Sequence, residues 1–128
     1  EVGSVATDFA HEDIGTTLNK CYRYLEILGK EALYVRLGVG TVASSSVIYY
    51  NQMYSSKRAP PSVTMTGTIY ANVYPGGSTG SAISAVDYSS AQSAMVSIDS
   101  GTGMTAGSCG LVATSATTGD YLTISAEL

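Results

Sequence analysis

The chain has little charge, a single histidine, two cysteines and no tryptophan. Charged residues make up 12% of its 128 residues, whereas an average soluble protein has about a quarter. One histidine and two cysteines are too few for a zinc site or a disulfide framework, so we expect no metal and no other cofactor. Cys21 and Cys109 form either one disulfide bond or two small apolar side chains in the core.

Basic residues are absent from the second half of the chain. All six lysines and arginines precede position 59, and the net charge is −4. Nucleic acids and anionic membrane surfaces bind clusters of Lys and Arg, so neither is an expected partner. No apolar run approaches the roughly 18 residues that span a bilayer, and no basic segment precedes an apolar one at the amino terminus. We therefore expect a soluble chain without membrane insertion, whose secretion signal is either absent or already removed.

The sequence is instead rich in short strand-like segments that glycines and serines separate. Hydrophobic residues make up 45% of the chain, which is enough for a core, and the length fits one domain over residues 1–128. Roughly eight short strands at such spacing are typical of a sandwich or barrel. The sequence therefore predicts an all-β fold, a jelly-roll-like antiparallel β-sandwich. We expect one short helix near the amino terminus, capped by Asp13, with Ile14 and Leu18 on one face.

The clearest strand covers residues 63–73, where apolar and polar residues alternate. Alternation with a period of two is the signature of a strand with one face in the core, and we interpret the whole segment as one strand. The composition of residues 75–81 predicts a loop. Further strands are predicted at residues 22–28, 33–38, 47–54, 83–88, 94–99, 110–115 and 121–128.

Three sequence patterns could indicate catalysis, but each lacks a necessary part. Residues 76–80 match G-x-S-x-G, which needs a following helix and a downstream histidine, whereas His11 lies upstream. Residues 38–43 match G-x-G-x-x-A, but no helix is predicted after them to bind a phosphate. The acidic residues Asp8, Glu12 and Asp13 suit a helix cap better than a carboxylate pair in a cleft. We therefore expect no enzyme activity.

Tyrosine and amide side chains indicate a candidate ligand-binding surface. Tyr70, Asn72 and Tyr74 share the outward face of the strand at 63–73. Aromatic rings beside an amide can stack on sugars and form directional hydrogen bonds to their hydroxyls. The alternative is that these tyrosines pack at a subunit interface or border the core.

A second group of candidate residues lies on the strand predicted at 47–54. Tyr50, Gln52 and Tyr54 face outward if Tyr49 and Met53 point inward. We therefore add Tyr50 and Tyr54 to the candidate ligand-binding residues.

Three segments, taken together and in order, resemble a known family. They are Cys21-Tyr22-Arg23-Tyr24, Met53 followed by Arg58-Ala59-Pro60-Pro61-Ser62-Val63, and the terminal Ser125-Ala126-Glu127-Leu128. They are similar to the C-Q-R-Y, M-R-A-x-P-x-V and F-S-A-E-L patterns in the carboxyl-terminal domain of bacteriophage tail-fibre and other virion appendage proteins. This chain departs from the family at Tyr22, at the inserted residues 54–57 and at Ile124.

The resemblance implies a jelly-roll-like β-sandwich that is displayed on a phage virion after assembly in the host cytoplasm. It implies a homotrimer or contacts with other virion subunits, and recognition of host-surface polysaccharide. It also implies that Arg23 is a charge partner within the sandwich. Two alternatives stay open: a purely structural virion protein, such as a capsid decoration or tail component, and a fragment of a polysaccharide depolymerase.

Overall fold

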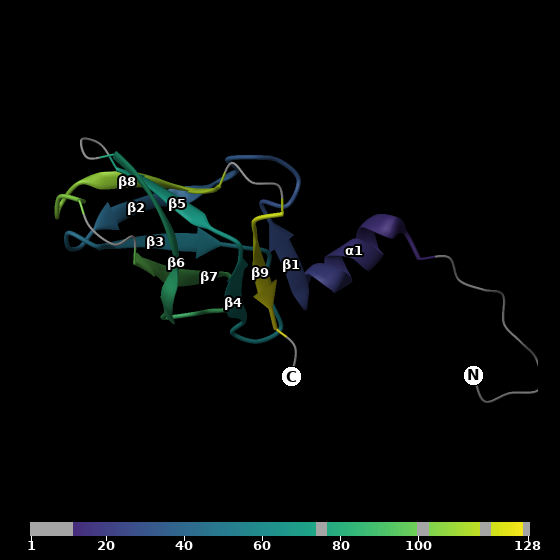
Figure 1. The fold of residues 1–128 in the computed structure, drawn as a ribbon. Coiled ribbons are helices and arrows are strands. Elements are labelled where there is room, and N and C mark those ends of the chain that lie inside the picture. Colours follow the sequence, from purple (N-terminus) through teal and green to yellow (C-terminus); the bar gives the residue numbers. More distant parts are fainter. Residues whose placement is uncertain (1–11, 74–76, 100–102, 116–118, 127–128) are drawn as a thin grey trace, which may run out of the picture.

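The computed structural model describes residues 12–73, 77–99, 103–115 and 119–126. Over these residues the chain forms one short helix and nine strands, all paired antiparallel (Figure 1). The elements are α1 (Ile14–Tyr22), β1 (Leu25–Leu28), β2 (Arg36–Val42), β3 (Val47–Met53), β4 (Ser62–Thr66), β5 (Ile69–Val73), β6 (Gly77–Asp87), β7 (Ser93–Asp99), β8 (Cys109–Thr114) and β9 (Tyr121–Ser125).

The strands form two sheets. Within the described residues, a three-stranded sheet has the order β1-β9-β4, and the other six strands close a barrel in the order β2-β3-β7-β6-β5-β8. The small sheet stands between the barrel and α1, which projects from the rest of the molecule (Figure 1). The prediction of an all-β antiparallel fold with two sheets and one short helix is confirmed. The structure adds that the larger sheet closes on itself through the pairing of β2 with β8.

The core of the barrel consists mainly of β-branched and small side chains that alternate with outward-facing residues. Ile48, Val96 and Val112 are completely buried. Gly40 and Gly110 face each other across β2 and β8, and a Cβ added at either would lie within 3.0 Å of the Ile48 Cδ1 atom. The Ile48 side chain therefore occupies space that exists only because both residues are glycines.

The segment 63–73 is two strands rather than one, and this part of the sequence interpretation is wrong. β4 belongs to the small sheet and β5 to the barrel. The chain bends at Gly67, which has a φ of 83° and whose added Cβ would overlap the Asp120 carboxylate. A glycine was needed for that close approach, but it also fits the alternating pattern and so gave no sign of a break.

The predicted loop at 75–81 is also partly wrong. The strand β6 begins at Gly77, which pairs with Val73, the last residue of β5.

The predicted helix is confirmed. The Asp13 carboxylate accepts hydrogen bonds from the Gly15 and Thr16 backbone N–H groups at the start of α1, and no residue of this helix is buried.

A buried ion pair links the small sheet to the connection between β3 and β4. The Lys57 side chain is fully buried, and its Nζ lies 2.8 Å from the Glu26 Oε2 atom. Lys57 also donates to the Tyr22 carbonyl, and the Ser55 N–H donates to Glu26 Oε2. Burial alone raises the pKa of Glu26, but the hydrogen bonds from Lys57 and Ser55 outweigh it and hold the pKa below its usual value.

Arg23 does not have the role that the family resemblance implied. It is exposed and forms no ion pair within the described residues. Lys57, which lies in the insertion relative to the family pattern, provides the buried charge instead. A lysine in a Ser-Ser-Lys-Arg run is expected at the surface, so this buried pair could not be predicted from the sequence.

Candidate ligand-binding groove

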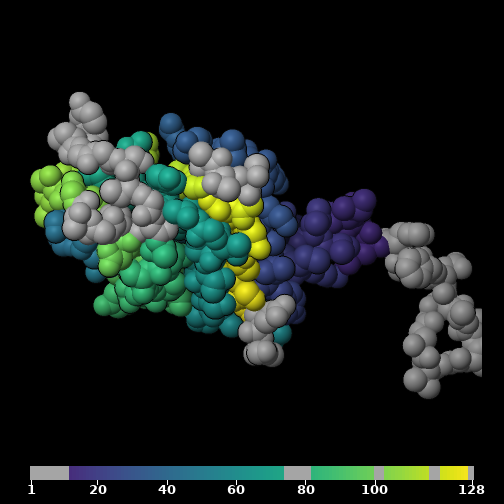
Figure 2. Space-filling model, in the orientation of Figure 1, coloured from purple at the N-terminus to yellow at the C-terminus, as the bar shows by residue number. Residues whose placement is uncertain are grey.

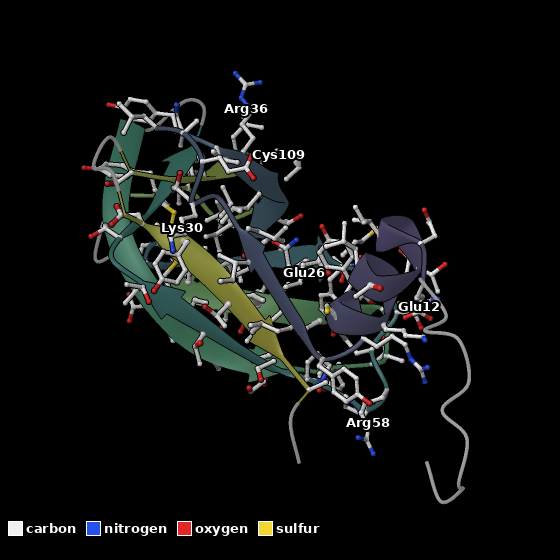
Figure 3. All side chains as sticks on the ribbon, turned by 90° about the vertical axis from the view of Figure 1, so that its right-hand side faces the viewer. Glu12, Glu26, Lys30, Arg36, Arg58 and Cys109 are labelled. Carbon is white, nitrogen blue, oxygen red and sulfur yellow. The ribbon has the colours of Figure 1, made fainter. Side chains whose placement is uncertain are left out.

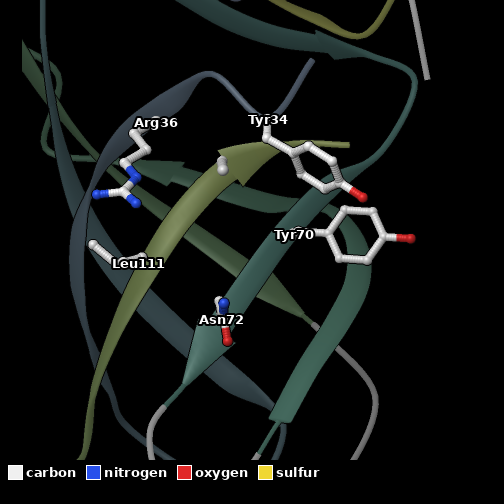
Figure 4. A pocket seen from close by; sticks show the side chains of 6 residues that line it. Tyr34, Arg36, Tyr70, Asn72 and Leu111 are labelled. Carbon is white, nitrogen blue, oxygen red and sulfur yellow. The ribbon is translucent and has the colours of Figure 1, made fainter. Parts of the chain in front are cut away.

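A groove lies on the outer face of the barrel, across β2, β8 and β5 (Figure 4). Its volume is about 230 Å³. The lining residues are Tyr34, Arg36, Tyr70, Asn72, Leu111 and Ala113.

Strand pairing places three of these residues beside β8, which itself contributes Leu111 and Ala113. Arg36 and Tyr70 both pair with Ala113, from opposite sides. One step along the face, Asn72 pairs with Leu111. Because residues two apart in a strand share a face, Ala113 and Leu111 form the floor. The methyl group of Ala113 leaves the space between Arg36 and Tyr70 open.

Tyr34 reaches the groove through an unusual backbone conformation. Its φ is 54°, in the left-handed region, which costs a bulky residue about 1–3 kcal/mol. Hydrogen bonds hold the backbone in this conformation: the Tyr34 N–H donates to the Ser115 carbonyl at 3.1 Å, and the Val35 N–H donates to Thr114 Oγ1 at 2.9 Å. The Tyr34 side chain is 60% exposed, so its ring is not placed there by core packing.

Arg36 reaches the groove because of a β-bulge. The register of β2 against β8 shifts between Arg36 and Gly38, which leaves Leu37 as the extra residue. The bulge turns both Leu37 and Gly38 toward the interior, where Leu37 packs on the core. A regular strand would have placed Arg36 inward, since Gly38 and Gly40 face the interior. With the bulge, Arg36 is exposed on the outer face.

The groove combines aromatic rings that can stack on a ligand with polar side chains that can form hydrogen bonds to it. Figure 4 shows the Tyr34 and Tyr70 rings next to each other, with Arg36 across β8 from them. Arg36 is the sole charged group among the lining residues that the structure describes. Asn72 adds an amide that can both donate and accept hydrogen bonds.

Comparison with known proteins gives no assignment for this site. No family model, curated protein or solved structure matches the chain. The geometry of the groove and the sequence resemblance are therefore the basis for a functional proposal.

Two of the five candidate residues from the sequence lie in the groove. Tyr70 and Asn72 are on the outer face of β5, as their parity predicted. Tyr74 lies outside the described residues. The sequence interpretation missed the other lining residues, although the alternation at 33–38 did place Tyr34 and Arg36 on one face. Their proximity to Tyr70 depends on the pairing of β8 with both β2 and β5, which alternation does not show.

The predicted outward orientation of Tyr50 and Tyr54 is wrong. The side chains of β3 have the opposite parity, so Tyr50 is 2% exposed while Met53 is 70% exposed. Ile48 decides which residues of β3 face inward, because it is completely buried. Tyr50 and Gln52 lie two and four residues further along the strand and therefore face the core with it. Polar residues at 51 and 52 made the two phases hard to distinguish from the sequence.

Both buried tyrosines contribute to the core rather than to a surface. Burial raises the pKa of Tyr50, whose hydroxyl has no hydrogen-bond partner among the residues that the structure describes. Burial also raises the pKa of Tyr54, whose hydroxyl donates to the Ser90 carbonyl at 2.9 Å.

The motifs considered for catalysis lie in strands and caps. Residues 38–42 are part of β2 and Ser78 is part of β6, so neither lies at a strand-to-helix turn. Glu12 pairs with Lys20 beside the helix, while Asp8 and His11 lie outside the described residues.

Cys21 and Cys109 are both exposed free thiols, so they are neither bridged nor in the core. Where the structure describes the chain, no group of three or more His, Cys, Asp or Glu side chains could hold a metal ion. The helix described is too short and too polar to cross a membrane.

Proposed function

We propose that this chain is a host-recognition domain of a phage virion appendage, such as a tail fibre, and that it binds host-surface polysaccharide in the groove. The virion setting is supported by the resemblance of three segments to the appendage family. The binding role is supported by one observation: two tyrosine rings, an arginine and an asparagine line one groove over a floor of Leu111 and Ala113.

Sugars fit this arrangement chemically. A pyranose ring has apolar C–H faces that stack on aromatic rings, and hydroxyls that need directional hydrogen bonds. Tyr34 and Tyr70 provide the rings, while Arg36 and Asn72 provide polar groups. The groove volume of about 230 Å³ is below the roughly 300–1,000 Å³ of sites that enclose drug-sized ligands. We therefore expect it to hold one sugar unit of a chain that continues along the surface.

The strained backbone at Tyr34 also fits a binding role. Strain that surrounding hydrogen bonds maintain is typical of functional positions. A ring held in place before the ligand arrives loses less freedom on binding, which improves affinity.

The test is a glycan array that includes bacterial surface polysaccharides, probed with the purified chain. We expect binding to a restricted set of glycans, with loss of that binding in a variant whose groove is emptied by Tyr34→Ala and Tyr70→Ala. Absence of binding to every glycan would contradict the proposal.

A second candidate, a structural virion protein, is favoured by the surface of α1. Ile14, Leu18 and Tyr22 recur every four residues on one face of this helix, and all three are exposed. Figure 2 shows α1 projecting from the molecule. A free helix of nine residues is only marginally stable in water, so a partner on this apolar stripe would stabilise it. A second copy of the chain, as in a homotrimer, is the partner we propose. Sedimentation velocity tests this assembly.

A further inference from the structure

We infer that the groove takes an acidic sugar, and that Arg36 binds its carboxylate. This inference rests on the proposed function, because it names the class of sugar that the groove selects.

Most basic residues of this chain already have a partner within it. Lys20 pairs with Glu12 and Lys57 with Glu26. Lys30 and Arg58 lie over tyrosine rings at 5.5 Å and 5.4 Å from the ring centroids. Within the described residues, the guanidinium groups of Arg23 and Arg36 have no ion pair and no ring contact. Of these two, only Arg36 lies in the groove.

The backbone is irregular at the positions that place groove side chains. Tyr34 has a left-handed φ, and the bulge lies between Arg36 and Gly38. A bulge redirects the side chains beside it, and here it moves a cation from the interior to the groove. In Figure 3, Arg36 points away from the barrel, at the opposite end of the molecule from Arg58.

The surroundings favour an anionic ligand at this one place. Among the lining residues that the structure describes, none has a carboxylate, so these residues offer no internal acid that would compete with the ligand for the guanidinium. Elsewhere the chain is acidic, with a net charge of −4 and no basic residue after Arg58. The overall field therefore disfavours loose association of anions, and a bound anion would depend on Arg36.

A sugar carboxylate suits the geometry across β8. Arg36 and Tyr70 flank Ala113 on neighbouring strands, so their backbones are about 10 Å apart, which is two interstrand spacings. A hexuronate whose ring lies against the tyrosines would extend its carboxylate over Ala113, toward Arg36. The planar guanidinium forms two parallel hydrogen bonds to a planar carboxylate, which a lysine cannot reproduce.

The experiment compares three probes by isothermal titration calorimetry: oligogalacturonate, its methyl ester and a sulfated galactan oligosaccharide. We expect the wild-type chain to bind oligogalacturonate, and its methyl ester at least about tenfold more weakly. Arg36→Gln should weaken oligogalacturonate binding by a similar factor and weaken binding of the ester much less. Arg36→Lys should recover only part of the loss. Arg23→Gln is the matched control, because it removes the same charge outside the groove, and its affinity should stay within about twofold of wild type.

Four results would overturn the inference. If the ester binds as tightly as the acid, or if Arg36→Gln and Arg23→Gln behave alike, the groove binds sugar without using the carboxylate, and the proposed function stands. If the sulfated oligosaccharide binds more tightly than the uronate, the site selects sulfate esters. If none of the probes binds and a glycan array is also negative, the proposed function fails together with the inference.

Discussion

Tyr70 is the groove residue whose substitution best separates binding from folding. It is half-buried on the outer face of β5, and its neighbours in the groove are exposed or small. Tyr70→Ala should reduce glycan binding by at least about tenfold, since aromatic contacts dominate such sites. The free energy of unfolding should change by no more than about 1 kcal/mol, as for other partly exposed positions. Array binding and urea denaturation measure the two effects.

Tyr88→Ala provides the control for that substitution. Tyr88 is 87% exposed and does not line the groove, so its removal should leave binding intact. Equal losses in the two variants would show that the effect does not come from the groove.

Gly67 tests how the chain passes from one sheet to the other. Its φ is 83°, and an added Cβ would overlap the Asp120 carboxylate, which accepts a hydrogen bond from Ser115. Gly67→Ala should therefore destabilise the protein by about 2–4 kcal/mol, because backbone strain and a displaced buried carboxylate act together. Gly103→Ala is matched, since Gly103 has a φ of 103° but open space around it. It should cost only about 1 kcal/mol. Urea denaturation of both variants separates the effect of the overlap with Asp120 from the effect of the backbone strain, which both positions share.

Between elements, the Glu26–Lys57 pair connects β1 to the segment after β3, and it predicts a pH dependence. The pKa of Glu26 is lowered on folding from the usual 4.5. Its contribution to stability is therefore fully present above about pH 4.5, and it is lost as pH falls through the lowered folded pKa. Glu26→Gln should lower the free energy of unfolding at pH 7 by about 2 kcal/mol, because Lys57 would keep a buried, unpaired charge. The variant should also lose less stability than wild type on acidification.

Glu12→Gln is the control for this pH dependence. Glu12 also pairs with a lysine, but the pair is exposed, and exposed pairs contribute little to stability. Urea denaturation between pH 3 and pH 7 should show a flatter profile for Glu26→Gln alone. Parallel profiles for wild type and Glu26→Gln would contradict the assigned role of Glu26.

The elements also show which parts of the fold could be predicted from the sequence. The pattern of strand-like segments between glycines and serines located β3, β7, β8 and β9, and the Asp13 cap located α1. It did not give the phase of β3, where polar residues occupy both faces, or the break at Gly67. Two of the six lining residues of the groove, Tyr70 and Asn72, were predicted. The positions of the others relative to them depend on the bulge at Leu37 and on barrel closure, which arise from contacts between distant segments.

At the scale of the whole molecule, the groove and α1 are separate surfaces, so binding and assembly can be tested independently. The groove lies on the barrel, whereas α1 projects beyond the small sheet (Figures 1 and 2). A chain that both binds glycans and assembles through α1 would present several grooves at once. Multivalent binding then raises the avidity for a repetitive polysaccharide without any new contact.

The apolar stripe of α1 gives the last prediction. If a second copy covers it, Ile14→Gln together with Leu18→Gln should shift sedimentation from an oligomer to the monomer, because glutamine keeps helix propensity but removes apolar surface. Thr16→Gln, on the opposite face of α1, should leave the oligomer intact. The monomeric variant should still bind a single soluble glycan with unchanged affinity, but should bind an immobilised polysaccharide at least about 100-fold more weakly. A wild-type chain that sediments as a monomer at all concentrations would rule out a second copy as the partner of this helix.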